Sequence, residues 1–344
     1  MRALADVAGT WMGTSHRQKP VKDAVASVRR GLTELFSLPD GYEVVLGNGG
    51  TTVFWDAATF GLIEERSQHL VFGEFSSKFA DAVAAAPHLK EPDRVETEPG
   101  THPLARAVDG IDVYALTHNE TSTGVAMPLE RPPGTSGALV AVDATSGAGA
   151  IRWRATDVDV YYFAPQKVFA GDGGLWLAVC SPAATDRIER IGASGRWVPA
   201  SLDLLIALDN SRKDQTYNTP ALATLFLLDQ QVRWFNDNGG LEWSAGRSAQ
   251  SASILYGWAE ESPFATPFVT DPAKRSPVVG TIDLDASVDA ATVSNVLRAT
   301  GSVDTDAYRK RGRNQVRIGR VPSIDPADVD ALTRCIDYVV GQIS

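Results

Sequence analysis

Short apolar segments of strand length alternate with longer amphipathic segments over the first two thirds of the chain. We predict strands at 42–46, 69–72, 112–117, 137–142, 158–163 and 175–179. Helical periodicity covers 7–36, with a break at 13–20, and returns at 53–63, 203–210 and 221–235. This alternation is typical of an α/β fold in which a mostly parallel sheet lies between helices.

The clearest break in the pattern is the polar, glycine-ending segment at 236–240. Beyond it come an amphipathic segment to about residue 260, an apolar run at 278–282, a helical segment at 290–300 and a last helix from 325. We therefore predict a large domain over residues 1–240 and a smaller C-terminal α+β domain over residues 241–344.

Composition restricts the class of protein. The 344 residues are 44% hydrophobic and 22% charged, and the net charge of −10 argues against a nucleic-acid-binding surface. We expect neither a secretory signal, because Asp6 interrupts the first residues, nor a membrane span, because no apolar run is long enough. Cys180 and Cys335 fit no metal-ligand spacing and no disulfide framework, so we expect two core thiols, no metal site and a cytoplasmic protein.

Two of the predicted strands lead directly to reactive residues. The run at 137–142 leads to Asp143, and the run at 158–163 leads to Gln166 and Lys167. The carboxyl ends of parallel strands share one crevice, so an acid and a lysine would face the same pocket. Pyridoxal phosphate requires a lysine for its aldehyde and a carboxylate for its ring nitrogen. A strand-ending Asp and a solvated loop lysine are the plainer alternative.

A glycine turn at 47–52, sequence GNGGTT, connects a predicted strand to a predicted helix. Free amides at a helix start bind phosphate, and the turn lacks both the dinucleotide and the P-loop spacing, so it suits a single phosphate. A tight turn without a ligand is the alternative. Phe75 and Thr121 follow two other strands, where they could stack on a flat ring and bond a phenolic oxygen, although a core Phe is more usual.

Basic residues gather at two places in this acidic chain. His16 and Arg17 stand beside a helix end, and the segment 308–320 contains six Lys and Arg residues. Arginine binds carboxylate and phosphate in a bidentate way, but exposed basic loops explain both places equally well. The polar segment 212–220 precedes an apolar helix, whose start could bind a second anion or the same phosphate from another subunit, while capping alone would explain Thr219.

Taken together, these segments resemble the phosphoserine aminotransferases, class V enzymes of the fold-type I group that depend on pyridoxal phosphate, and in particular their actinobacterial-type branch. The resemblance covers essentially the whole chain. It is carried by MGTSHR at 12–17, GNGGTT at 47–52, GEFS at 73–76, HNET at 118–121, VD at 142–143, QK at 166–167 and YNTP at 217–220.

The resemblance implies a cytoplasmic homodimer with shared active sites and roles for particular residues. Lys167 would hold the cofactor as a Schiff base and Asp143 would pair with its ring nitrogen. The implied cofactor contacts are Gly50, Thr51, Phe75, Thr121 and Gln166, with Asn218 and Thr219 reaching the phosphate from the neighbouring subunit. The implied substrate-binding residues are His16, Arg17, Lys310, Arg311 and Arg317.

The implied reaction is reversible amino transfer between L-phosphoserine with 2-oxoglutarate and 3-phosphohydroxypyruvate with L-glutamate, in serine biosynthesis. Use of phosphohydroxythreonine, in pyridoxine biosynthesis, stays open. Three residues depart from the family's usual pattern: Phe75 where Trp is common, Thr51 where Arg is common, and Lys310 where His is common. We also expect that a Gly-Pro-containing segment before the first helix is missing from the sequence. Another class V enzyme, such as an alanine–glyoxylate-type aminotransferase or a desulfurase, or a non-catalytic cofactor-binding form, is the alternative.

Overall fold

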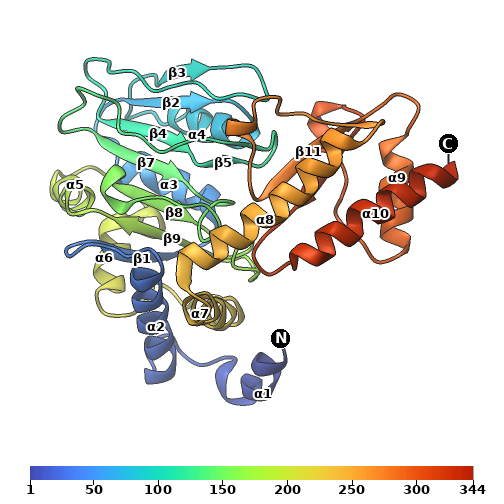
Figure 1. The fold of residues 1–344 in the computed structure, drawn as a ribbon. Coiled ribbons are helices and arrows are strands. Elements are labelled where there is room, and N and C mark those ends of the chain that lie inside the picture. Colours follow the sequence, from blue (N-terminus) through green and yellow to red (C-terminus); the bar gives the residue numbers. More distant parts are fainter. Residues whose placement is uncertain (344) are drawn as a thin grey trace.

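The computed structural model describes residues 1–343 and contains a seven-stranded sheet in the order β1-β9-β8-β7-β4-β2-β3 (Figure 1). The strands are β1 (Glu43–Asn48), β2 (Ser67–Val71), β3 (Asp93–Glu96), β4 (Val113–Thr117), β7 (Leu139–Asp143), β8 (Val160–Phe163) and β9 (Leu175–Cys180). Every neighbouring pair is parallel except the two that involve β9. The predicted mostly parallel sheet is confirmed.

Both faces of this sheet are covered at its centre, which explains why the central strands β4, β7, β8 and β9 are almost continuously apolar. Tyr161 and Phe163 face a core shared with α2 (Lys19–Leu35) and α7 (Leu222–Asp237). Val160 and Tyr162, the alternate residues of the same strand, face the opposite core. That second core includes α3 (Thr51–Gly61), α4 (Glu74–Ala84), α5 (Pro182–Ala193) and α6 (Leu204–Ser211).

The C-terminal part has a sheet and a core of its own. Its antiparallel strands are β10 (Ala265–Pro267), β11 (Val279–Leu284) and β12 (Gln315–Gly319). They share a core with α8 (Gly240–Glu261), α9 (Ala290–Ala299) and α10 (Pro326–Ile343). The long helix α8 runs from beside α7 to this small sheet (Figure 1). The predicted boundary between residues 240 and 241 coincides with the first residue of α8.

The remaining elements are short or peripheral. Helix α1 (Arg2–Trp11) packs on α7 through Trp11, whose indole donates to the Leu222 carbonyl over 2.9 Å. Strands β5 (Asn119–Glu120) and β6 (Val125–Ala126) form a two-residue hairpin ladder. Single-turn 3-10 helices occur at Ala155–Asp157, Ala200–Leu202, Pro272–Lys274 and Arg309–Arg311.

The structure corrects one expectation about the cysteines. Cys180 lies buried at the end of β9, as expected of a core thiol, but Cys335 is exposed on α10. The amphipathic pattern around Cys335 predicted the helix correctly but placed this residue on the wrong side of it. Within residues 1–343, no helix combines the length and the apolarity needed to cross a membrane.

Candidate active site

A cavity of about 280 Å³ opens at the carboxyl edge of the large sheet. Asp143 is the last residue of β7 and Thr117 the last residue of β4, and both line it. The first residues of α3 and α4 form the opposite wall, and Lys167, in the loop after β8, completes it. The crevice predicted from the strand ends is therefore present, and the acid and the lysine share it.

Asp143 is buried and accepts hydrogen bonds on both carboxylate oxygens. Its Oδ1 accepts from the Thr145 hydroxyl over 2.6 Å and from the Thr145 amide over 2.9 Å, and its Oδ2 accepts from the Trp55 indole over 3.1 Å. Burial raises the pKa of the Asp143 carboxyl to about 6, although these three donors act in the opposite direction. The ionised carboxylate can therefore bind a positively charged group of a ligand in the cavity.

Lys167 lies in the loop that follows β8, and its side chain lines the same cavity. Its side chain is open to the cavity, but the surrounding protein partly desolvates the amine, which lowers the pKa of Lys167. The positive charge of Arg317, on β12, lowers that pKa further. Both effects favour the neutral amine, which is the form that reacts with a carbonyl group.

The glycine turn lies beside these two residues. Gly49 has a φ of +100°, a conformation that favours glycine, and helix α3 begins two residues later at Thr51. Gly50 and Thr51 line the cavity, and the Thr51 hydroxyl lies 2.9 Å from that of Thr145. The start of α3 leaves amides without intrahelical partners, so the cavity contains a place for an anion.

Polar groups on the β5 side of the cavity form a small network around Ser146. The Ser146 hydroxyl accepts from the Thr121 hydroxyl over 2.7 Å and from the Asn119 side-chain amide over 2.9 Å. Gln166 also lines the cavity. The buried Asn119 Oδ1 has no hydrogen-bond partner within the described residues, so one polar group there is free for a ligand.

Phe75 lines the cavity from the first turn of α4, and a buried acid holds that turn in place. Glu120 is fully buried and accepts from the Phe75 amide over 3.0 Å and from the Ser76 amide over 2.9 Å. A carboxylate at a helix N-terminus satisfies free amides and complements the helix dipole. Sequence reasoning assigned no role to Glu120, because its partners lie about 45 residues earlier in the chain.

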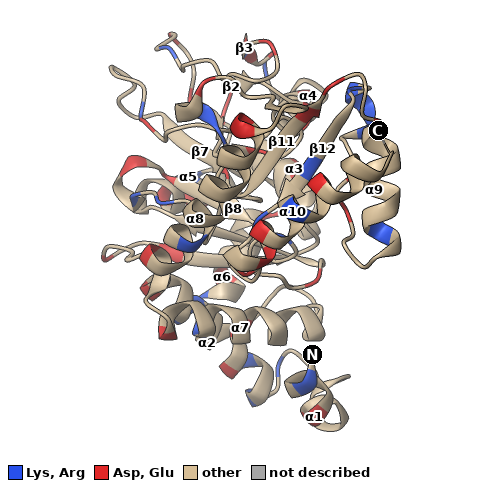
Figure 2. Ribbon diagram, turned by 45° about the vertical axis from the view of Figure 1, so that its right-hand side comes forward, with Lys and Arg blue, Asp and Glu red and all other residues tan. Residues whose placement is uncertain are grey.

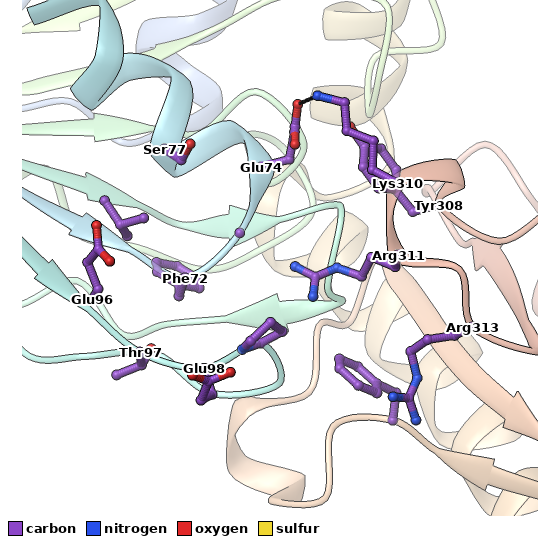
Figure 3. A pocket seen from close by; sticks show the side chains of 14 residues that line it. Phe72, Glu74, Ser77, Glu96, Thr97, Glu98, Tyr308, Lys310, Arg311 and Arg313 are labelled. Atoms are coloured by element: carbon purple, nitrogen blue, oxygen red, sulfur yellow. Dashed lines mark hydrogen bonds and ion pairs between the residues drawn. The ribbon is translucent and has the colours of Figure 1, made fainter.

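The cationic segment of the small domain faces a second, larger cavity of about 650 Å³, here called the outer groove (Figure 3). Lys310 donates to Glu74 on α4, whereas the Arg311 guanidinium points into the groove (Figure 3). The hydrogen bond from Lys310 is the main cause of a lowered pKa for Glu74. Arg317 lies over the Tyr308 ring, 5.5 Å from its centroid.

The other predicted site residues gather elsewhere on this chain. The His16 Nδ1 lies 3.1 Å from the Thr219 hydroxyl, and the Asn48 side chain donates to the Thr219 carbonyl over 3.0 Å. Arg17 and Asn218 are exposed beside them. Partial burial, followed by the charge of Arg17, lowers the pKa of His16. None of His16, Arg17, Asn218 and Thr219 lines the cavity of Lys167 in the described part of the chain.

The donor set of the inner cavity fits pyridoxal phosphate. An amine with a lowered pKa, a buried carboxylate, a helix start for the phosphate and an aromatic ring surround one volume, and Asn119 offers an unused polar atom. Together with the mostly parallel sheet, this arrangement defines a fold-type I enzyme that depends on pyridoxal phosphate.

Comparison with known proteins gives the family. The family model described as aminotransferase class-V matches residues 4–305, so the chain belongs to the class V aminotransferases. A phosphoserine aminotransferase of Rhodococcus jostii is 60% identical over 343 residues, which span all of this chain and 92% of the relative. The protein is accordingly an aminotransferase whose cofactor is pyridoxal phosphate.

Solved structures agree on the fold. A phosphoserine aminotransferase from Cytophaga hutchinsonii has a TM-score of 0.89 at 22% identity, covering 98% of this chain and 93% of its own. An alanine–glyoxylate aminotransferase from Nostoc sp. has a TM-score of 0.80 at 17% identity, covering 98% and 92%. Because both share the fold, the fold alone does not select the substrate.

Proposed function

We propose that this aminotransferase exchanges the amino group between L-phosphoserine with 2-oxoglutarate and 3-phosphohydroxypyruvate with L-glutamate, in serine biosynthesis. The observation that carries the proposal is a pair of arginines: Arg311 lines the outer groove, and Arg317 is close enough to Lys167 for its charge to lower the pKa of that amine. Neither Arg311 nor Arg317 forms a salt bridge within residues 1–343. Glutamate ends in a carboxylate and phosphoserine in a phosphate, and an arginine fork binds both groups. The 60% identity to a phosphoserine aminotransferase supports the same substrate.

In this proposal, Lys167 is the residue that holds the cofactor and Asp143 the partner of its ring nitrogen. Phe75 stacks on the ring, Gln166 and Thr121 flank it, and Gly50 with Thr51 binds its phosphate. The shared cavity and the network around Ser146 support these assignments. Lys310 and Arg311 receive the anionic side chain of the substrate, and Arg317, near the Lys167 amine, receives the α-carboxylate.

The residues contribute by moving and holding protons. When bound, pyridoxal phosphate supplies a ring that accepts electrons from the substrate α-carbon. Lys167, once displaced by the substrate amine, removes the α-proton as a base and later returns one as an acid, and its lowered pKa suits both tasks. Asp143 keeps a proton on the ring nitrogen by remaining ionised in its buried position. The walls formed by α3 and α4 limit the access of water.

The proposed assembly is a homodimer with shared sites. His16, Arg17, Asn218 and Thr219 form one exposed cluster that does not line the cavity of their own chain. The cluster is available to the neighbouring subunit, where Asn218 and Thr219 would reach the cofactor phosphate, and His16 and Arg17 the substrate.

Other features bear on partners and compartment. We propose a cytoplasmic location, since both cysteines are free thiols, one buried and one exposed. Lys and Arg occur on elements throughout the ribbon (Figure 2), and the net charge is −10, which supports small-molecule partners over nucleic acid.

The positions of the two thiols also bear on the alternative hypothesis that the enzyme is a desulfurase. Such an enzyme needs a cysteine in a mobile loop near the cofactor. Cys180 lies in the core of the sheet, and burial raises the pKa of its thiol to about 12, while Cys335 lies on α10. Both positions disfavour a reactive thiol beside Lys167.

The visible absorption of the purified holoenzyme tests the substrate. We expect L-phosphoserine and L-glutamate each to remove the yellow absorption of the bound cofactor, while L-alanine, the control, leaves it unchanged. A protein that responds to alanine and not to phosphoserine would make the alanine–glyoxylate type correct. A protein that cannot take up the cofactor would overturn the assignment of Lys167 itself.

A further inference from the structure

The buried tryptophan Trp55 contacts the acid at the base of the cofactor cavity. It is the fifth residue of α3, and its ring is stacked on Phe79 of α4 with centroids 6.3 Å apart. From this position its indole N–H donates to Asp143 Oδ2 over 3.1 Å. Trp55 is 5% exposed and also lines the cavity.

The two oxygens of Asp143 are held unequally. Oδ1 accepts two hydrogen bonds, both from Thr145, and Oδ2 accepts one, from Trp55. A carboxylate oxygen accepts two hydrogen bonds, so Oδ2 keeps capacity for one more donor. The indole therefore fixes the orientation of the carboxylate and leaves one oxygen available toward the cavity.

Burial and a nearby negative charge favour a neutral Asp143, although Lys78 and Lys167 line the same cavity. The carboxyl is fully buried, and the negative charge of Glu120 adds to the effect of burial. Burial, followed by the negative charge of Asp143, raises the pKa of the Tyr161 and Tyr162 hydroxyls on β8 well above the usual value. Burial also lowers the pKa of the adjacent His118 to about 3, so this ring supplies no positive charge. The ionised carboxylate thus depends on its few hydrogen-bond donors.

We propose that Trp55 is a positioning residue for the transamination: its indole N–H orients the Asp143 carboxylate and stabilises its negative charge, so that Asp143 can hold the protonated ring nitrogen of pyridoxal phosphate. Trp55 acts through Asp143 and contributes no reacting atom. The proposal depends on the cofactor and is independent of which amino acid is the substrate.

The replacement Trp55→Phe removes the donor and keeps a buried aromatic ring. Without the indole donor the pKa of Asp143 rises, so the carboxylate becomes protonated at a higher pH than in the natural protein. For a rise of about one pH unit, the dissociation constant of pyridoxal phosphate should increase about twofold at pH 7 and nearly tenfold at pH 5, where the Asp143 carboxyl is mostly protonated. The fall in affinity on acidification, near pH 6 in the natural protein, should begin about one pH unit higher.

Trp176→Phe is the matched control. Trp176 is a buried tryptophan of the same core, packed edge-on against Phe54 with centroids 5.1 Å apart, and it lies outside the cavity. Equilibrium dialysis of the cofactor from pH 5 to pH 8 measures all three proteins. A pH profile displaced in Trp55→Phe and unchanged in Trp176→Phe supports the proposal. If the two variants have equal pH profiles of cofactor binding and equal losses of thermal stability, Trp55 serves only in packing and the proposal is wrong.

A second measurement needs no change at Trp55. Each of the eight tryptophans gives one indole N–H resonance in a ¹⁵N-labelled full-length chain without cofactor. One of them should shift with a midpoint near pH 6 in the natural sequence and stop shifting in Asp143→Asn. If no indole resonance follows this titration, the hydrogen bond does not sense the charge of Asp143, and the proposal fails.

Discussion

The inner cavity and the outer groove differ in how their charged groups are held. Asp143 lines the cavity and Glu120 supports the first turn of α4 behind it; both are buried, and both accept hydrogen bonds from neighbouring elements of the large sheet and its helices. In the outer groove, Arg311 forms no salt bridge in the described structure, whereas Arg313 is paired with Asp283 of the same small sheet. Lys310 has a partner, Glu74, but that partner belongs to the other domain.

The difference follows from the ligand that each region would bind, the cofactor in the cavity and the substrate in the groove. A cofactor that stays bound is held best by a rigid site in which every charged group is hydrogen-bonded, because an unpaired buried charge is energetically costly. A substrate that enters and leaves with a phosphate or a carboxylate needs cations that are not already neutralised. Such cations are tolerated only where water reaches them, which is the case at the groove. The hydrogen-bonded carboxylates and the unpaired cation thus lie in different parts of the structure.

The largest effect is expected from a test of shared sites. Lys167→Ala and Arg17→Ala chains should each be nearly inactive alone, the first because it lacks the base and the second because it lacks a substrate cation. Co-expressed, they should recover about a quarter of the natural activity, because half of randomly paired dimers are mixed and each has one undamaged site. Transaminase assays of the co-expressed mixture, purified without separating the three kinds of dimer, measure this. If Arg17 serves its own chain, every site stays damaged and no activity returns.

A smaller effect is expected from the spare cations of the groove. Arg311→Ala should lower kcat/KM for phosphoserine by about 10- to 100-fold, as expected for a lost charge-assisted contact. Arg309→Ala is the control, because Arg309 belongs to the same short helix and is exposed. Steady-state kinetics with both amino acids measure the effect. Equal losses in the two variants would show a diffuse electrostatic effect, and Arg311 would no longer count as a binding residue.

The smallest effect is expected where the two regions meet. Glu74→Gln should release Lys310 for the substrate and lower KM for phosphoserine by about two- to fivefold, since the ion pair is partly exposed. The control, Glu98→Gln, removes the same charge from the same groove, where Glu98 forms no salt bridge in the described structure. An equal decrease in both variants would mean that the total charge of the groove, and not competition for Lys310, sets the affinity.

Much of the fold and of the inner site was predictable because its signals are local. Strand and helix periods were read from neighbouring residues, and they placed all but one strand of the large sheet; β3, with its polar sequence, and helices α4 and α5 were missed. Asp143 and Lys167 were found because strand ends mark the crevice of a parallel sheet, and the glycine turn because backbone geometry there requires glycine at Gly49.

Only the tertiary structure brought together the partners of these residues. Trp55 meets Asp143 across 88 positions, and Lys310 meets Glu74 across 236. Periodicity tells which residues are buried but does not tell which buried groups touch, and it misplaced Cys335 at the margin of a helix face. The sequence by itself determined the elements, the class of fold and the reactive pair. The hydrogen bond from Trp55 to Asp143 and the ion pair of Lys310 with Glu74 join side chains that meet only when distant elements pack. A hydrogen bond requires a distance of about 3 Å in space, whatever the separation along the chain.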